Sequence, residues 1–254
     1  MQGVAQDLID PDVSGYSGEV AERLATSVKS LVGVYLHGSG AFGDFSRARS
    51  DVDILAVSSD GLSDAVKQRL RDALSPRSLA CPGTGLEFSL VRRDSLRPLR
   101  SAPPFEVHIA TKTKDETETF VDGDGRRGDP DLVLHYAVLK SHGVTLLGPP
   151  ASEVFPEVPR DLLLRALRRE LDWAEENAPA TYQVLTAARA WRFAAEDVIC
   201  SKSDGAQWAR QRVDDPRVID AALEHRRGAE AHPDDGRARA FVEDVRARLA
   251  AVRR

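Results

Sequence analysis

The stretch GSGAFGDFSRARSDVDILAV, residues 38–57, places a small-residue turn and a pair of aspartates at the ends of two apolar runs. The turn follows VYLH (34–37), which predicts a short strand, and the aspartates lead DVDILAV (51–57), which predicts a second. Side chains at positions i and i+2 of a strand project from one face, so the carboxylates of Asp51 and Asp53 are expected side by side. Two like charges at that spacing repel unless a cation lies between them. The stretch therefore predicts a cation site near a glycine-serine turn.

The small residues Gly38, Ser39 and Gly40 come directly after the first of these strands. Backbone amides at such a turn can surround an oxyanion, and carboxylates without His or Cys ligands favour Mg²⁺, which typically also binds the phosphates of a nucleotide. Asp-x-Asp occurs four times in the chain, but three copies stand beside Gly or Pro and indicate turns. Only the copy at 51–53 leads an apolar run. We therefore expect a site for a metal ion and a nucleotide here.

Hydrophobic periodicity in the first part of the chain indicates a mixture of strands and helices. Helices are expected at 17–32, 62–74 and 132–143, and strands at 34–37, 51–57, 86–91 and 105–111. Ser17 is the expected N-cap of the first helix. The segment FVDGDGRRGDPD (120–131) is rich in Gly and Asp and predicts a turn. This order of elements is typical of the α+β class.

A Pro-rich stretch, GPPASEVFPEVPRD (148–161), is the best candidate for a domain linker. After it the periodicity is helical throughout, with segments expected at 161–177, 181–195, 203–211, 215–227 and 234–252. We therefore predict two domains, an α+β domain at residues 1–157 and an all-α helical bundle at residues 158–254.

The composition argues against several classes of protein. The 254 residues carry a formal charge of −5 with acids and bases interleaved, which argues against a nucleic-acid partner. Cys81 and Cys200 are far apart and lie in no metal-ligand spacing, so neither disulfides nor zinc are indicated. Residues 1–20 lack the features of a signal peptide, and no segment approaches the ~20 apolar residues of a membrane span. We expect a cytoplasmic monomer that binds neither nucleic acid nor membrane.

Four motifs resemble those of one enzyme family. They are LHGSGAFGDFSRARSDVDILAV (36–57), GLEFSLV (85–91), LTAARAW (185–191) and SKSDGAQWA (201–209). Gly-Ser followed by Asp-x-Asp resembles the nucleotidyltransferase superfamily, and the whole order resembles the aminoglycoside 3''-adenylyltransferases, the streptomycin and spectinomycin adenylyltransferases. The resemblance implies a polymerase-β-like nucleotidyltransferase domain at 1–157 and a helical substrate- and nucleotide-binding domain at 158–254. It also implies transfer of AMP from ATP, with Mg²⁺, to a hydroxyl of an aminoglycoside or aminocyclitol antibiotic, with release of pyrophosphate.

The resemblance also assigns roles to residues of the first domain. Glu87, on the strand LEFSLV, is implied to be the general base and to bind metal together with Asp51 and Asp53. A carboxylate in the middle of an apolar run is costly to bury unless it is paired with another group or has a functional role. The alternative is an edge-strand glutamate in solvent. Gly38, Ser39 and Ser50 are implied nucleotide contacts.

In the second domain, Arg189 and Lys202 match the family's arginine and lysine that reach the triphosphate. The alternative for this pair is two solvated surface cations. For a polycationic acceptor, an acidic pocket with an aromatic face is expected. RRELDWAEEN (168–177) supplies Glu170, Asp172, Glu175 and Glu176 with Trp173, and His108 is expected to face the acceptor.

Two departures from the family bear on the acceptor. The chain is shorter after Asn177, which removes an acidic loop that contacts streptomycin in the relatives, and His108 stands where they carry a tryptophan. Both weaken the case for streptomycin and leave spectinomycin or another hydroxylated amine. Two other functions stay open: nucleotidyl transfer to a protein hydroxyl, as in toxins or antitoxins, and a catalytically idle nucleotide-binding module. The helical bundle argues against the first, and the three acids Asp51, Asp53 and Glu87 argue against the second.

Overall fold

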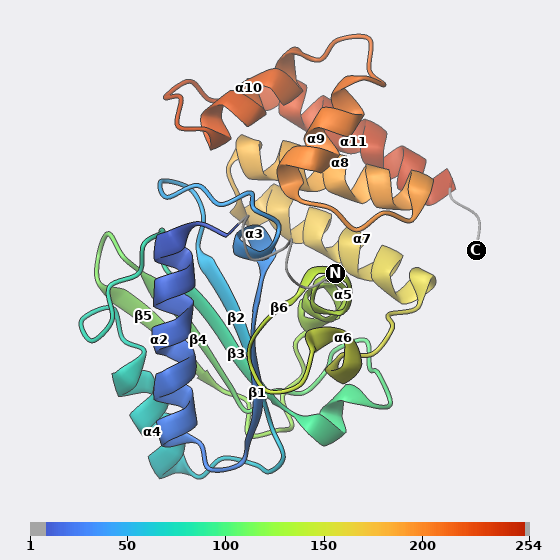
Figure 1. Ribbon diagram of the computed structural model, residues 1–254. Coiled ribbons are helices and arrows are strands. Elements are labelled where there is room, and N and C mark those ends of the chain that lie inside the picture. The colour runs from blue at the N-terminus through green and yellow to red at the C-terminus, as the bar shows by residue number, and fades with distance from the viewer. Residues whose placement is uncertain (1–8, 252–254) are drawn as a thin grey trace. The chain divides into compact units, whose positions relative to one another are not determined.

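A six-stranded mixed sheet forms the framework of the first unit of the chain (Figure 1). The computed structural model describes residues 9–251, and the chain divides into two compact units, Met1–Val158 and Pro159–Arg254. In the sheet the strands follow the order β5-β4-β3-β2-β1-β6, and β2 and β3 are parallel while the other neighbours are antiparallel. The strands are β1 (Leu31–His37), β2 (Val52–Ser58), β3 (Leu86–Arg92), β4 (Val107–Lys112), β5 (Thr117–Asp122) and β6 (Val144–Leu147). With an all-helical second unit, this confirms the α+β class.

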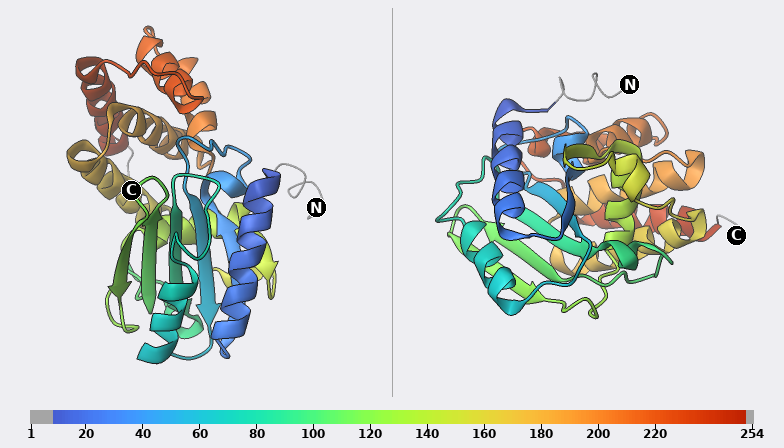
Figure 2. Two further views of the ribbon diagram at one scale, coloured as in Figure 1. Left: turned by 90° about the vertical axis from the view of Figure 1, so that its left-hand side faces the viewer. Right: turned by 60° about the horizontal axis from the view of Figure 1, so that its bottom comes forward.

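Both faces of the sheet are covered by helices in the first unit, as the two views of Figure 2 show. One face packs against α2 (Pro11–Ser27) and α4 (Asp64–Ala73), and its buried core includes Phe88 and Leu90. The other face packs against α5 (Leu132–His142) and its core includes Tyr35. Because successive strand residues point to opposite faces, Glu87 and Ser89, on either side of Phe88, lie on the face that α5 covers. The short elements α3 (Gly38–Ala41), η1 (Arg93–Leu96) and α6 (Ala151–Val154) connect these layers.

The first helix begins earlier than its apolar periodicity predicts. The α2 helix starts at Pro11 because the side chain of Asp10 accepts a hydrogen bond of 2.9 Å from the backbone amide of Asp12, and proline is tolerated in the first turn. Ser17, the predicted N-cap, is buried within the helix and donates to the carbonyl of Ser14. The predicted start was therefore wrong by six residues, and β1 correspondingly begins at Leu31.

A strand lies where part of a turn was predicted. The segment Thr117–Asp122 pairs antiparallel with β4 as the edge strand β5, and only the remainder of 120–131 forms the loop that leads to α5. Its alternating Thr, Glu and Phe side chains leave one face half exposed, which is common for an edge strand and gives a weak hydrophobic pattern. The missed strand is therefore explained by its place at the margin of the sheet.

The second unit is helical throughout its described residues, 159–251. Its helices are α7 (Arg160–Asn177), α8 (Ala180–Glu196), α9 (Lys202–Arg210), α10 (Arg217–Arg226) and α11 (Asp235–Ala251), each within two residues of a predicted segment. The α8 helix packs against the other four. Small buried residues such as Ala187 and Ala190 allow this close packing. Among residues 9–251, no helix is long and apolar enough to cross a membrane.

Candidate active site

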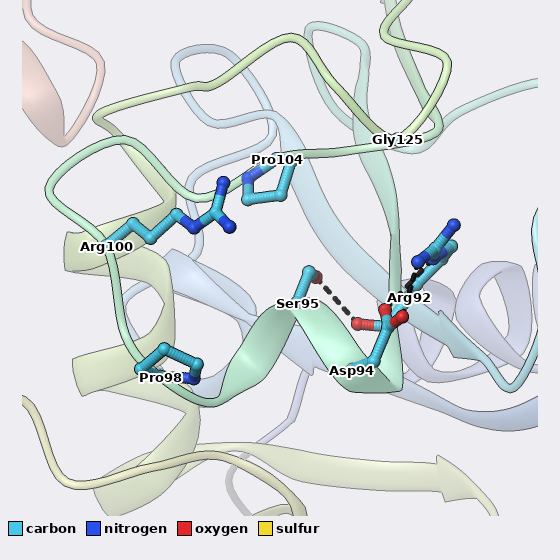
Figure 3. Close-up of a pocket in the computed structure, with 7 residues that line it drawn as sticks. All are labelled: Arg92, Asp94, Ser95, Pro98, Arg100, Pro104 and Gly125. Atoms are coloured by element: carbon cyan, nitrogen blue, oxygen red, sulfur yellow. Dashed lines mark hydrogen bonds and ion pairs between the residues drawn. The ribbon is translucent and has the colours of Figure 1, made fainter.

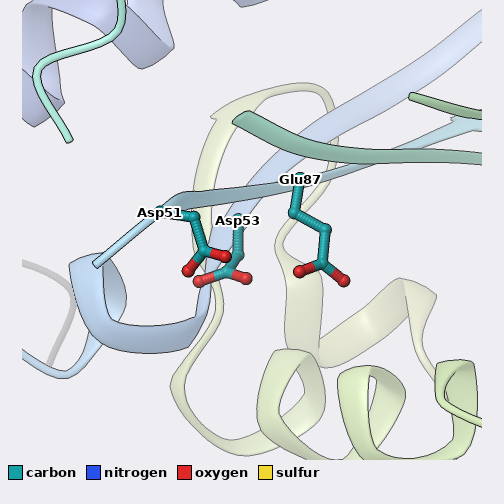
Figure 4. Close-up of side chains that lie close together, drawn as sticks. All are labelled: Asp51, Asp53 and Glu87. Atoms are coloured by element: carbon teal, nitrogen blue, oxygen red, sulfur yellow. The ribbon is translucent and has the colours of Figure 1, made fainter. Parts of the chain in front are cut away.

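Three carboxylates converge at one end of the parallel strand pair. Asp51 directly precedes β2, Asp53 lies within it, and the register of β2 and β3 pairs Asp53 with Glu87. One carboxylate oxygen from each residue lies within 4.8 Å of the other two, and all three side chains point the same way in Figure 4. The structure therefore brings together the three acids that the sequence analysis selected.

Glu87 does not lie on an edge strand. β3 is the third strand of the sheet, hydrogen-bonded to β4 on one side and to β2 on the other, so the alternative of a solvent-facing edge glutamate was wrong. The Glu87 side chain is 35% exposed, which leaves it accessible to a ligand although its neighbours Leu86 and Phe88 are buried in the opposite face. A glutamate held in this way can contact a bound substrate.

The turn after β1 passes directly over one of these acids. Gly38 has a φ of +58°, in the region that favours glycine, and begins the single helical turn α3. A Cβ placed at Gly38 would lie 2.5 Å from Asp53 Cγ and closer still to Oδ2, so only glycine fits. The predicted small-residue turn is thus a helical turn whose backbone touches the Asp53 carboxylate.

Ser39 carries an unsatisfied hydroxyl beside this carboxylate cluster. Its Oγ is buried and has no hydrogen-bond partner within residues 9–251. A buried hydroxyl without a partner costs free energy, and a phosphate oxygen would satisfy it. Together with the three carboxylates, whose oxygens suit a hard cation, this donor fits Mg²⁺ and the phosphates of a nucleotide.

Ser50 is used differently from Ser39. It is buried, and its Oγ accepts a hydrogen bond of 3.1 Å from the backbone amide of Ser46. Its carbonyl accepts a bond of 2.8 Å from the amide of Thr84, close to the start of β3. The residue thus fixes the loop that carries Asp51, and a direct nucleotide contact by Ser50 stays a prediction.

Histidines line the same face of the sheet. His108 on β4 lies opposite Ser89, two residues along β3 from Glu87, and its Nδ1 is 3.0 Å from Ser89 Oγ. Burial lowers the pKa of His108, so the ring is neutral at neutral pH. The structure therefore places His108 on the carboxylate face, and its contact with the acceptor stays a prediction.

One further histidine was missed by the sequence analysis. His135, in the first turn of α5, places Nε2 3.9 Å from Glu87 Oε1, and its ring centroid is 4.7 Å from that of His37. Burial lowers the pKa of His37 well below its ordinary value, and the charge of the nearby His135 lowers it further. The only sequence signal for His135 is a lone polar residue in the apolar run LVLHYAVL.

The two cations predicted to bind the triphosphate are not ordinary surface residues in the second unit. Arg189 Nη2 donates to both carboxylate oxygens of Glu170, at 2.8 and 2.9 Å. Lys202 Nζ lies 3.6 Å from the ring centroid of Tyr182. The alternative of two solvated cations was therefore wrong for Arg189, whose charge is buried and paired.

The residues predicted to bind the acceptor on α7 have mixed environments. Trp173 is 54% exposed and available to a ligand. Glu176 is exposed, whereas Glu175 pairs with Arg246 Nη2 at 2.9 Å. Glu170, which the sequence analysis grouped with them, is instead occupied by Arg189. Acceptor binding by Trp173, Glu175 and Glu176 stays a prediction.

A separate pocket of about 130 Å³ lies at the other end of β3 (Figure 3). It is lined by Arg92, Asp94 and Arg100 among others, and the Arg92 guanidinium is already paired with Asp94. None of the predicted site residues lines this pocket. The candidate active site is therefore the carboxylate cluster and not this cavity.

Comparisons with known proteins show that the chain is similar to adenylyltransferases. The C-terminal domain family of aminoglycoside adenylyltransferases matches residues 153–251. A spectinomycin 9-adenylyltransferase of Staphylococcus aureus is 30% identical over 188 residues, which cover 71% of each chain. An aminoglycoside (3'') (9) adenylyltransferase of Klebsiella pneumoniae is 28% identical over 196 residues, which cover 72% of each. The fold is similar to that of a spectinomycin adenyltransferase from Enterococcus faecalis, crystallised with ATP and spectinomycin, with a TM-score of 0.67 and 18% identity over 91% of this chain and 95% of that one.

Proposed function

Because this chain belongs to the aminoglycoside adenylyltransferase family and is therefore a nucleotidyltransferase, we propose that it transfers AMP from ATP to a hydroxyl of spectinomycin or a related aminocyclitol. The observation that carries the proposal is the convergence of Asp51, Asp53 and Glu87 within 4.8 Å beside the Gly38 turn. A protein that only bound a nucleotide would not need a third, accessible carboxylate at this point.

The chemistry follows from the position of Glu87. Its carboxylate accepts the proton of the acceptor hydroxyl while the hydroxyl oxygen attacks the α-phosphorus of ATP. A new phosphorus–oxygen bond to the acceptor forms, the bond to the β-phosphate bridge breaks, and pyrophosphate leaves. Asp51 and Asp53, with Glu87, would hold Mg²⁺, which when bound supplies positive charge to the phosphates. Gly38 and Ser39 contribute donors to phosphate oxygens, and no covalent enzyme intermediate is needed.

The second unit contributes the remaining proposed contacts. Arg189 and Lys202 are proposed to bind triphosphate oxygens, and Trp173, Glu175 and Glu176 to bind the cationic acceptor. Spectinomycin is favoured over streptomycin because α7 ends at Asn177 and α8 starts at Ala180, so no loop long enough to reach a ligand separates them. The acceptor is supported in addition by the two relatives named for spectinomycin.

Product analysis tests this proposal. In two separate reactions, the protein is incubated with Mg²⁺, ATP and either spectinomycin or streptomycin. Each reaction is followed by mass spectrometry of the drug and by a pyrophosphate assay. We expect spectinomycin to gain one AMP group with release of one pyrophosphate, and EDTA to stop the reaction.

Variants then test the catalytic assignment. Glu87→Gln is expected to keep ATP binding and to lose about 10²- to 10⁴-fold in the transfer rate, the usual contribution of a general base. Glu22→Gln, on the exposed side of α2, serves as the matched control and should be unchanged. No AMP-drug product with the wild-type protein, or full activity of Glu87→Gln, would contradict the proposal.

A further inference from the structure

One buried carboxylate in the second unit connects both cations that are proposed to bind the triphosphate. The Glu170 side chain is 10% exposed and accepts from Arg189 Nη2 through both of its oxygens. Its Oε1 also accepts a hydrogen bond of 3.1 Å from the hydroxyl of Tyr182. The ring of Tyr182 in turn lies 3.6 Å from Lys202 Nζ. The four side chains therefore form one continuous cluster on α7, α8 and α9.

The backbone around this cluster leaves little freedom. A Cβ on Gly205 of α9 would lie 2.7 Å from the Cα of Arg189 on α8, so the two helices approach as closely as glycine allows. The helix that begins with Lys202 is thereby held against the helix that carries Arg189 and Tyr182. Long cationic side chains lose conformational freedom when they bind a ligand, and prior ordering reduces that cost.

The charges of the cluster do not cancel. Burial alone would raise the pKa of Glu170, but the adjacent Arg189 and Lys202 outweigh it and lower the pKa, so the carboxylate stays ionised. Two cations and one anion leave a net positive charge. In addition, Arg189 Nε is buried and has no hydrogen-bond partner in the described part of the chain. The cluster is thus preassembled around an ionised Glu170, and Arg189 Nε remains as a donor for a ligand.

We propose that Glu170 and Tyr182 are positioning residues that hold Arg189 and Lys202 in the arrangement that binds the nucleotide triphosphate. Glu170 orients the guanidinium of Arg189, and Tyr182 supports the ammonium of Lys202 with its ring while its hydroxyl is fixed by Glu170. The inference rests on the proposed function, in which the two cations bind the triphosphate. It also removes Glu170 from the acids that are available to the acceptor.

The test compares the binding of two nucleotides by isothermal titration calorimetry in the presence of Mg²⁺. One is an ATP analogue with a methylene group between the α- and β-phosphorus atoms, which cannot be cleaved there, and the other is AMP, which lacks the β- and γ-phosphates. Tyr182→Leu is expected to weaken binding of the analogue about 3- to 30-fold, the range of a cation–π contact that is lost. Tyr182→Phe keeps the ring and should lose less. Glu170→Gln should weaken binding of the analogue about 10-fold, as expected for an orienting charge pair.

The control and the second nucleotide separate positioning from damage to the fold. The control is Glu196→Gln on α8, the helix that also carries Arg189 and Tyr182. The Glu196 carboxylate accepts hydrogen bonds from Trp208 Nε1 and Arg212, neither of which belongs to the cluster. The variant should therefore bind both nucleotides as the wild type does. The positioning variants should keep AMP binding within about 2-fold, because AMP lacks the phosphates that the cations would hold. An equal loss for AMP and the analogue would overturn the inference in favour of a structural role.

A third variant distinguishes this inference from its premise. If Lys202→Met weakens binding of the analogue but Tyr182→Leu does not, the inference is wrong while the proposed function stands. If Lys202→Met binds the analogue as well as the wild type does, the nucleotide role of Lys202 fails, and the inference fails with it. Losses in Lys202→Met and Tyr182→Leu, with a smaller loss in Tyr182→Phe, support both.

Discussion

Replacement of Gly38 by alanine tests the close approach between the turn and the carboxylate cluster. The new Cβ would lie 2.5 Å from Asp53 Cγ, whereas real Cβ atoms keep at least 3.0 Å, so the carboxylate must move by 0.5 Å or more. Metal ligands tolerate only about 0.2 Å, and a misplacement of ~1 Å at a reacting centre costs about 10²-fold in rate. The φ of +58° adds strain of about 1–2 kcal/mol for a residue with a side chain. We therefore expect Gly38→Ala to lose about 10²-fold in adenylyl transfer and about 1–3 kcal/mol in the free energy of unfolding.

Transfer rates and urea unfolding measured on the same preparation separate the two effects. Gly228→Ala is the matched control, because Gly228 also has a positive φ, of +111°, but a Cβ there would touch nothing within 4 Å. It should lose stability and keep activity. Asp53→Asn provides the reference for loss of the carboxylate itself. Gly38→Ala with normal transfer, or an equal loss of transfer in Gly228→Ala, would refute the reasoning.

Two further predictions concern stability. Lys67→Met should lower the free energy of unfolding by about 3 kcal/mol, because Lys67 and Glu106 are each only 3% exposed and the substitution leaves Glu106 buried without the lysine. The substitution also breaks the ion pair between Lys67 and Asp122. Urea unfolding measures the change, and a loss under about 1 kcal/mol would show that the pair of Lys67 and Glu106 is unimportant for stability. Burial lowers the folded-state pKa of His37 and His108 below the ordinary 6.5, so below pH 6.5 the unfolded state binds protons that the folded state does not, and stability falls as the pH falls from 7 to 5. For metal-free protein in EDTA, His37→Gln should reduce the fall in the free energy of unfolding between pH 7 and pH 5.5 by about 1 kcal/mol. An unchanged pH dependence of stability in His37→Gln would contradict the role given to His37.

The central features of the site follow from local patterns. The alternation of a strand places Asp51 and Asp53 on one side, and an apolar run after them identifies a buried strand. The position of Glu87 in an apolar run marked it as unusual, but only the family resemblance assigned it to the same site as Asp51 and Asp53. Its place beside Asp53 depends on the parallel register of β2 and β3, a contact between segments distant in sequence. Local spacing therefore predicted that Asp51 and Asp53 lie together, whereas the position of Glu87 beside them depends on the pairing of strands.

Features that depend on packing could not be predicted in this way. His135 meets Glu87 because α5 packs on the sheet, and Glu170 meets Arg189 because α7 packs on α8. A periodicity argument places such residues on a helix but does not say what they touch, which is why Glu170 was assigned to the acceptor. The helices of the second unit were predicted to within two residues because their apolar stripes are strong.

Errors in the first unit came from weaker signals. The start of α2 is set by a capping interaction of Asp10, which lies before the apolar stripe begins. The edge strand β5 was taken as part of a turn because its polar face is open to solvent and its hydrophobic pattern is short. Neither error changes the position of the carboxylates, since Asp53 and Glu87 lie on the central strands β2 and β3 and Asp51 directly precedes β2.

The most direct test of the account is a crystal structure of the protein grown with Mn²⁺ and the uncleavable ATP analogue, with anomalous data collected at the manganese edge. Mn²⁺ is a hard cation that accepts the same oxygen ligands as Mg²⁺. We predict an anomalous peak within bonding distance of the carboxylates of Asp51 and Asp53 and next to that of Glu87, with phosphate oxygens of the analogue completing the coordination. A peak elsewhere, or an ordered nucleotide without any peak at these three carboxylates, would contradict the account.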